Sequence, residues 1–380
     1  MLRQALAISL EFSDGSILEV KGALDDALDL AERLGDSVRQ LHLHAGLSVF
    51  LARLGDADAA VIAAERSAAI AESSGDPILR IMAKWLLASA HFIAANHAVA
   101  KGHGEDALAL SSASGRDELP FFGYDQRVRG LVSLSLTLWM CGLPLQAKRI
   151  AQMAEDEAIR NASPLDLAIV LTNTSRLLIW IDDIEGASER IERATAHAAK
   201  HALHRYDPVA LGLVGELMVA RGNYEAAIAT LTIAVAHTRL EGSFVRASFV
   251  AAALTKALMA VGAPDKADAA ISDVLQLLGE RFESFSFPEV LRVKAEVLLA
   301  TPNPNAAVAE QWMLHSLERA RAHTALGWEL RTSTSLARLW AKQGRRREGR
   351  ELLRSVYGKF TEGFETPDLR AAASLLAEIA

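Results

Sequence analysis

The chain has 380 residues, of which 51% are hydrophobic and only 6% aromatic, and its formal net charge is −7. Surfaces that bind nucleic acid usually carry a basic excess, so we expect no direct nucleic-acid binding. The single cysteine, Cys141, excludes a disulfide framework. The sequence opens without a signal-peptide pattern, and its apolar stretches are too short or too interrupted to cross a membrane, so we expect a cytoplasmic protein.

A helix-to-helix turn recurs along the chain. The turn residues Gly142, Asp182, Gly222 and Gly262 are 40 residues apart, and Gly344 follows after about two further periods. Glycine at such a place supplies the left-handed cap that ends a helix, and the residues after it start the next one. The turn segments are RLGDADAA at 53–60, WMCGLPLQA at 139–147, WIDDIEGA at 180–187, ARGNYEAA at 220–227, AVGAPDKA at 260–267, TPNPN at 301–305 and AKQGRRREG at 341–349.

A second kind of break separates one repeat from the next. It places proline where a new helix begins, because proline is tolerated in the first helical turn. Each period therefore holds two helices of about 16 to 18 residues. These breaks are GDP at 75–77, NASP at 161–164, YDP at 206–208, FSFP at 285–288 and ETP at 365–367.

The two alternating breaks predict an all-α fold. We expect a right-handed α-solenoid of about nine tetratricopeptide-like helical hairpins, with a period of about 40 residues. The segment GNYEAAIATLTIAVA at 222–236 matches the tetratricopeptide pattern best. We expect a single continuous superhelix over residues 1–380 with a closing helix over 366–380, and no ATPase or DNA-binding domain.

No catalytic motif stands out in the sequence. It contains no phosphate-binding GxxxxGK[ST] loop, no GxSxG, no HExxH and no CxxC. Residues 102–107 match GxGxxA, but no strand precedes them, so this segment is interpreted as a turn. We therefore expect a protein that is not an enzyme and needs no cofactor.

Three histidines form the one candidate for a metal site. His197, His201 and His204 are spaced at i, i+4 and i+7, which would place them on one helix face where a zinc or nickel ion could bind. The alternative is a polar stripe at a helix end, where histidine suits the negative end of the helix dipole. The second interpretation is favoured, and no metal is expected.

Candidate ligand contacts lie in the first helix of each predicted hairpin, because these helices line the concave face of a solenoid. The segment FFGYDQRVRG at 121–130 places Asp125, Arg127 and Arg129 at the entry to a very apolar helix. Arg127 and Arg129 are two residues apart, so both cannot occupy the centre of one face. Each candidate either faces the groove or is merely exposed. The others are Trp85, His91, Arg176, Glu216, Lys294, Glu296, Trp328 and Arg331.

Three segments of the last third resemble a bacterial family. They are FPEVLRVKAEVLLA at 287–300, WELRTSTSLARLWAKQG at 328–344 and VYGKFTEGFETPDLRAAASLL at 356–376. They resemble the C-terminal tetratricopeptide-like region of STAND-type ATPases, which usually carry a winged-helix DNA-binding domain before the ATPase. Related tails occur with class III nucleotide cyclases. The resemblance extends over essentially the whole chain but covers only that C-terminal region of the family, so it implies a sensor or scaffold role and no ATP or DNA binding by these residues.

Two functions follow as hypotheses. The first is a non-catalytic sensor or scaffold of a bacterial signalling ATPase or transcriptional regulator, which binds an inducer or a protein partner in its concave groove. The ATPase and DNA-binding half would be attached or separate. The second is a stand-alone adaptor that assembles proteins through peptide binding. An adaptor should repeat one residue type at equivalent positions of successive first helices, and the charged candidates do not.

The two ends of the solenoid leave a homo-oligomer open. Leu2, Leu6 and Leu10 begin the chain without a visible helix cap. Leu369, Leu375 and Leu376 on the closing helix must be covered by the preceding hairpin or by a partner, because solenoid ends expose apolar surface unless something caps it.

Overall fold

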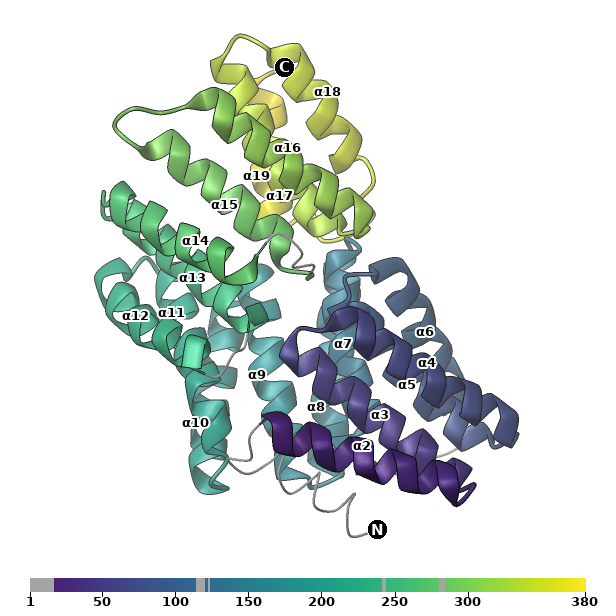
Figure 1. The fold of residues 1–380 in the computed structure, drawn as a ribbon. Coiled ribbons are helices and arrows are strands. Elements are labelled where there is room, and N and C mark those ends of the chain that lie inside the picture. Colours follow the sequence, from purple (N-terminus) through teal and green to yellow (C-terminus); the bar gives the residue numbers. More distant parts are fainter. Residues whose placement is uncertain (1–16, 114–119, 122–123, 241–243, 280–283) are drawn as a thin grey trace.

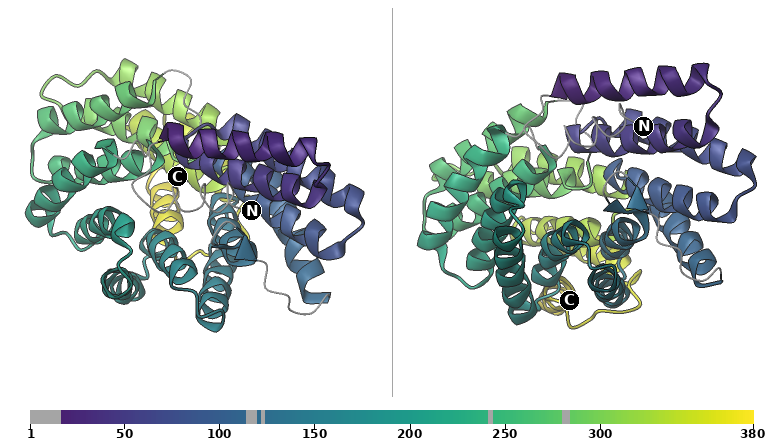
Figure 2. Two further views of the ribbon diagram at one scale, coloured as in Figure 1. Left: turned by 60° about the horizontal axis from the view of Figure 1, so that its bottom comes forward. Right: turned by 90° about the horizontal axis from the view of Figure 1, so that it is seen from below.

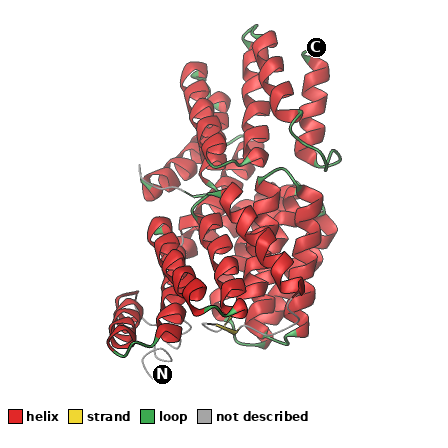
Figure 3. Ribbon diagram, turned by 90° about the vertical axis from the view of Figure 1, so that its right-hand side faces the viewer, coloured by secondary structure: helices red, strands yellow, loops and turns green. Residues whose placement is uncertain are grey.

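The computed structural model describes residues 17–113, 120–121, 124–240, 244–279 and 284–380 (Figure 1). These ranges contain 18 α-helices, one short 3-10 helix at His204–Tyr206 and a minimal antiparallel ladder between β1 (Pro120–Phe121) and β2 (Tyr124–Asp125). Short loops join almost all the helices (Figure 3). The predicted right-handed α-solenoid is confirmed, since 18 helices correspond to about nine hairpins. Leu2, Leu6 and Leu10 lie outside the described residues.

The inner helices form a continuous layer, because each packs against the next inner helix as well as against its own partner. They are the first helices of successive pairs, as the sequence predicts. Their bounds are α3 (Ser37–Leu54), α5 (Pro77–Ile93), α7 (Gln126–Met140), α9 (Pro164–Trp180), α11 (Asp207–Ala220), α13 (Phe244–Ala260), α15 (Phe287–Ala300) and α17 (Leu326–Lys342).

The second helix of each pair packs on the convex side of its inner helix. Two further helices flank the pairs: α2 (Ile17–Arg33) packs against α3, and α19 (Pro367–Glu378) packs against α17 and α18. The outer helices are α4 (Ala57–Ser74), α6 (His97–Ala113), α8 (Pro144–Arg160), α10 (Ile184–Lys200), α12 (Tyr224–Leu240), α14 (Pro264–Leu278), α16 (Ala306–Ala322) and α18 (Arg346–Tyr357).

The predicted turn residues all adopt the left-handed conformation. Gly142, Gly222, Gly262 and Gly344 have φ between 73° and 84°, and Asp182 has φ 68°. Glycine reaches this region without steric cost, and an αL residue lets the last helical carbonyls accept hydrogen bonds from the turn. The predicted proline starts are also confirmed, since prolines stand in the first turn of α5, α9, α11, α15 and α19.

The closing helix is covered by the chain itself. Leu369 and Leu375 are buried, and Leu376 packs against the same cluster, which α17 and α18 supply. The preceding hairpin therefore buries the apolar face of α19. Figure 2 shows this helix in yellow, inside the curve between the green and blue parts of the chain.

The superhelix meets itself at a seam between α7 and α17, two helices that are not neighbours in the repeat order. Trp139 of α7 packs edge-on against Trp328 of α17, with ring centroids 4.7 Å apart. The amide N–H groups of Leu145 and Gln146, at the start of α8, donate to the Glu362 carboxylate at 2.8 and 3.0 Å. We call these contacts the seam, and they hold the two halves of the chain in a closed turn.

None of the helices in the described ranges combines the length and the hydrophobicity that crossing a bilayer requires.

Candidate functional site

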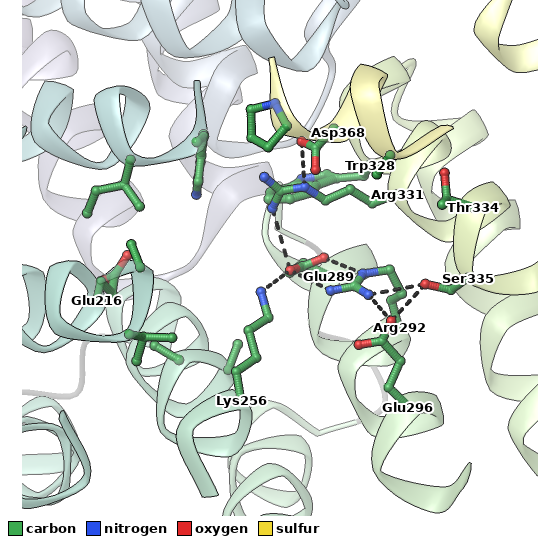
Figure 4. Close-up of a pocket in the computed structure, with 18 of the residues that line it drawn as sticks. Glu216, Lys256, Glu289, Arg292, Glu296, Trp328, Arg331, Thr334, Ser335 and Asp368 are labelled. Atoms are coloured by element: carbon green, nitrogen blue, oxygen red, sulfur yellow. Dashed lines mark hydrogen bonds and ion pairs between the residues drawn. The ribbon is translucent and has the colours of Figure 1, made fainter. Parts of the chain in front are cut away.

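A cavity of about 350 Å³ lies on the concave side of the solenoid (Figure 4). Its walls come from the five consecutive inner helices α9, α11, α13, α15 and α17, and from the closing helix α19. The curvature of the superhelix brings these helices around one space, although their residues span more than half of the sequence. Ligand pockets in proteins commonly enclose about 300–1,000 Å³, so this cavity has room for a small molecule.

One part of the cavity wall is apolar. It comes from the ends of α9 and α11 and the middle of α13. Trp180 and Phe249 pack against each other at 5.6 Å between ring centroids, and Trp180 packs against Trp328 at 5.3 Å. Aromatic side chains offer a large apolar surface at small entropic cost, as ligand sites require. The apolar lining residues of these three helices are Ile179, Trp180, Val219, Ala220, Phe249, Ala252 and Ala253.

The opposite part is charged, and Glu289 is its centre. Arg292 donates two hydrogen bonds to this buried carboxylate, at 2.7 and 2.9 Å, and the Lys256 ammonium lies 2.7 Å away. Arg331 lies 3.6 Å from the same carboxylate. Burial by itself would raise the pKa of Glu289, but the positive charges of Arg292, Lys256 and Arg331 outweigh it and hold this pKa well below its usual range. Glu289 is therefore ionised at neutral pH.

Further ion pairs extend from this centre. Arg292 also contacts the carboxylate of Glu296, and Ser335 donates a hydrogen bond to Glu296 at 2.8 Å. Arg331 donates to Asp368 of α19 at 2.8 Å, and its guanidinium carbon lies 4.9 Å from the ring centroid of Trp328. These contacts join Glu289, Glu296 and Asp368 with Lys256, Arg292 and Arg331 in one network, which restricts the rotamers of these six side chains.

Four charged residues occupy equivalent positions in successive repeats. Arg176, Glu216, Lys256 and Glu296 stand at the same register of α9, α11, α13 and α15, one period of 40 residues apart. Their charges alternate in sign along the concave face. Arg176 donates two hydrogen bonds to Glu216, at 2.8 and 2.6 Å, so neighbouring repeats are joined by a bidentate ion pair.

Four of the predicted contact residues line this cavity: Glu216, Glu296, Trp328 and Arg331. A fifth, Arg176, holds Glu216 in place and lies over the ring of Phe249, 4.3 Å from its centroid. Contact of these residues with a ligand stays a prediction.

The candidates at the start of α7 lie elsewhere. Asp125 caps this helix, since its side chain accepts from the N–H groups of Arg127 and Val128 and from the amide of Asn161. Arg127 pairs with Glu157 of α8 at 3.3 Å. Arg129 is half-buried and is not among the residues that line the cavity. The charged start of this apolar helix therefore serves its own capping and its packing on α8.

Two further candidates belong to α5. Trp85 is fully buried against Gly130 of α7, and its indole N–H points to the hydroxyl of Ser111 at 3.3 Å. His91 stacks on His103 of the paired helix at 5.6 Å between ring centroids. Both residues face the interior between helices, so the structure places neither of them in the cavity wall.

Lys294 lies on the side of α15 that faces away from the cavity. It pairs with Asp268 of α14 at 2.5 Å and donates to Ser272 at 2.8 Å. Arg292 and Glu296, two residues before and after it, point to the cavity. On a helix, residues two positions apart lie on different faces, which explains why Lys294 and Glu296 separate.

The three histidines do not share a helix face, and that prediction is wrong. Helix α10 ends at Lys200, Ala202 turns the chain with a φ of 53°, and His204 begins the 3-10 helix. His197 donates to the carbonyl of Pro164 at 2.8 Å, and His204 lies 3.3 Å from Asp207. Among the described residues, no group of three or more His, Cys, Asp or Glu side chains is arranged to hold a metal ion.

The main residues that sequence reasoning missed are Lys256, Glu289, Arg292 and Asp368. A signal exists for the first three. Lys256 continues the 40-residue register of Glu216, and Glu289 and Arg292 stand on the same face of α15 as Glu296, at i, i+3 and i+7. Asp368 has no such signal, because only the docking of α19 brings it to Arg331.

No protein-family model and no curated protein matches this sequence. Solved structures do resemble the fold. A Rap protein complexed with Competence and Sporulation Factor superposes with a TM-score of 0.59 and 10% identity, over 90% of this chain and 97% of that one.

Two weaker likenesses accompany it. A STAND protein with a tetratricopeptide repeat sensor from Pyrococcus horikoshii has a TM-score of 0.41 and 10% identity, over 84% of this chain and 49% of that one. Yeast Tom70 has a TM-score of 0.35 and 14% identity, over 94% and 95%. The likeness to the Rap protein shows that this chain has a tetratricopeptide-like helical-repeat fold.

Proposed function

We propose that this chain is a non-catalytic sensor or scaffold domain that binds an inducer, or a segment of a protein partner, in its concave cavity. The observation that carries the proposal is the cavity itself. It joins an apolar, aromatic wall to a rigid wall of paired charges, and five consecutive inner helices build it. Ligand sites typically combine such an apolar lining with a few fixed polar groups.

The charges of the cavity support binding over catalysis. Glu289 is ringed by three cations, and Glu216, Glu296 and Asp368 are each ion-paired to an arginine. A general acid or base needs a pKa near the working pH, whereas these cations hold the pKa of Glu289 far below it. We infer that the network orients a ligand and transfers no proton.

A regulatory setting is supported by two likenesses. The three C-terminal segments at 287–300, 328–344 and 356–376 resemble the repeat region of bacterial STAND-type regulators. The Rap protein with the similar fold was solved in complex with Competence and Sporulation Factor, so a repeat chain of this shape can hold such a factor. We propose that ligand occupancy here is passed to an ATPase or DNA-binding half, which is attached or separate.

The stand-alone adaptor is the weaker proposal. A uniform peptide clamp would repeat one residue type at equivalent positions, yet Arg176, Glu216, Lys256 and Glu296 alternate in sign. This alternation favours internal pairing between neighbouring repeats over a single row of ligand contacts.

Blocking the cavity tests the proposal. Ala220 lines the cavity and is exposed, so Ala220→Trp fills the space with little risk to the fold. Native mass spectrometry of protein purified from a bacterial host should show a retained compound or partner that this variant loses. Ala229→Trp, on the exposed face of α12, is the matched control and should retain it. Equal retention by both variants would place the binding site outside the cavity.

A further inference from the structure

Each carboxylate that lines the cavity already has a hydrogen-bond or ion-pair partner within the protein. Glu216 accepts two hydrogen bonds from Arg176, and Glu296 is contacted by Arg292 and Ser335. Asp368 accepts from Arg331, and Glu289 is surrounded by cations. A ligand with a positive charge would therefore meet carboxylates whose charge is already balanced by a paired cation, and it would also be repelled by those cations.

Two polar side chains of the lining make no hydrogen bond or ion pair in the part of the chain that the structure describes, and both are donors. Arg338 lines the cavity from α17, is exposed, and has no ion pair or hydrogen bond within the described ranges. The indole N–H of Trp180 has no acceptor in the part of the chain that the structure describes, and the nitrogen is not sealed away from solvent. Guanidinium and indole groups can donate hydrogen bonds but cannot accept them. The complementary ligand group is thus an acceptor.

The side chains around these two donors indicate the chemical character of the rest of the ligand. Trp180 belongs to the apolar wall with Phe249, Ala252 and Ala253, so the body of the ligand must be apolar. Arginine recognises a carboxylate with two parallel hydrogen bonds and adds a favourable charge. A cavity of about 350 Å³ stands at the small end of the range for ligand pockets, which fits a small molecule.

The geometry points to a small amphipathic carboxylic acid as the ligand of this cavity, with its carboxylate on Arg338 and its apolar body against Trp180 and Phe249. This inference rests on the proposed function, because it assumes that the cavity is the binding site. It adds the chemical class: an anion with an apolar body, in preference to a cation or a neutral analogue. The internal ion pairs stay intact when such a ligand enters, since only the two free donors are used.

The test uses three probes with one apolar body: octanoate, octanol and octylamine. Each is titrated into the full chain by isothermal calorimetry, below its micelle-forming range. Octanoate should bind at least about tenfold more tightly than octanol, and octylamine least of all. Arg338→Gln should abolish the preference of octanoate over octanol, whereas Arg354→Gln, an exposed arginine on α18 away from this cavity, should leave it unchanged.

Trp180→Phe keeps an aromatic side chain but removes the N–H and part of the apolar surface, so it should weaken octanoate and octanol alike and weaken octanoate more, by several-fold. Equal binding of octanoate and octanol, a preference that survives Arg338→Gln, or no binding of any probe would overturn the inference. Octanol binding that Ala220→Trp blocks would keep the cavity as a ligand site and reject only the carboxylate. The two proposals can therefore fail separately.

Discussion

Glu289 carries more of the site than any other residue. It is buried, and it is the shared partner of Lys256, Arg292 and Arg331, which come from three different inner helices. Without this carboxylate, three cations would face one another at short range in a partly desolvated place. The cavity's charged wall therefore depends on one side chain, Glu289, which belongs to no recognisable sequence motif.

Replacing this carboxylate should be strongly destabilising. Glu289→Gln keeps the shape and removes the charge, and breaking a buried ion pair typically costs about 3–5 kcal/mol. The midpoint of urea denaturation, followed by circular dichroism, should fall accordingly. Glu296→Gln is the control, because Glu296 is 30% exposed and solvent can replace its contacts, so its loss should be about 1 kcal/mol. Equal losses in the two variants would show that Glu289 is not the centre of the network.

His97 is a second residue whose environment has a measurable consequence. It starts α6 close to the seam, is fully buried, and neither ring nitrogen has a hydrogen-bond partner. Burial, and to a smaller extent the nearby His323, lowers the pKa of His97 to about 3. The folded state thus holds this imidazole neutral, whereas the unfolded chain protonates it below its ordinary pKa of about 6.5.

The pH dependence follows from that difference. Stabilisation by neutral His97 is complete above about pH 6.5 and is lost as the pH falls toward 3, by up to about 1.4 kcal/mol per pH unit. His97→Leu should therefore lose less stability than the wild type between pH 7 and pH 5, measured by denaturation midpoints at both values. His237→Leu, at an exposed position of α12, should leave the dependence as in the wild type. If the stability of the wild type and of His97→Leu fell equally between pH 7 and pH 5, His97 would not be the source of this pH dependence.

At the scale of elements, the repeat turns look equivalent in sequence but differ in their surroundings. Gly142 and Gly222 both adopt positive φ, at 83° and 78°. A Cβ atom at Gly142 would lie 2.6 Å from the Leu326 side chain and 3.0 Å from Phe360, whereas at Gly222 it would meet nothing within 4 Å. The first turn is part of the seam, and the second is open to solvent.

Replacing each of these two glycines by alanine should distinguish the free-energy cost of left-handed backbone strain from the cost of overpacking. Gly222→Ala should cost only the left-handed strain, about 1–2 kcal/mol. Gly142→Ala should cost that amount plus about 1–3 kcal/mol of overpacking against α17. Thermal melting of the two variants side by side checks the difference. Matching melting temperatures would mean that α17 gives way at no cost, and hence that the seam is loose.

At the scale of the whole molecule, the seam gives this solenoid a property that repeat arrays usually lack. Each unit of such an array normally contacts only its neighbours. Here Trp139 of α7 packs on Trp328 of α17, and Arg370 of α19 pairs with Asp182 at 2.7 Å, across nearly half of the chain. Trp328 belongs to the seam and to the cavity wall at once, so the closed turn and the cavity share a structural element.

Removing the Trp139 side chain should therefore weaken the packing of α7 and of α17 together. Trp139→Ala is expected to cost about 3–5 kcal/mol, because it empties a packed aromatic cluster. Hydrogen–deuterium exchange should quicken in peptides from α7 and from α17 together, and small-angle scattering should show a larger radius of gyration. Trp312→Ala on the outer helix α16 is the control, and it should raise exchange only in the helices that pack around α16 and leave α7 unchanged. A purely local effect of Trp139→Ala would argue against a closed turn.

The sequence by itself determined the local structure of this protein. Turn residues such as Gly142 and Asp182 mark where each helix ends, and prolines such as Pro164 mark where the next begins, because these signals act through backbone geometry within a few residues. The 40-residue period then predicts the stack of hairpins and which helices are inner. It also carries the register of Arg176, Glu216, Lys256 and Glu296, which follows from the repeat once the period is known.

Only the tertiary structure decided how the repeats surround a cavity. Trp85, Arg127 and Lys294 are as prominent in the sequence as Trp328 and Arg331, yet the first three pack against neighbouring helices and the last two face the cavity. The face that an inner-helix side chain occupies depends on the twist between successive hairpins, which accumulates over many repeats. The pairing of Arg331 with Asp368 and the closing of α7 on α17 depend on that accumulated curvature, and no local pattern records it.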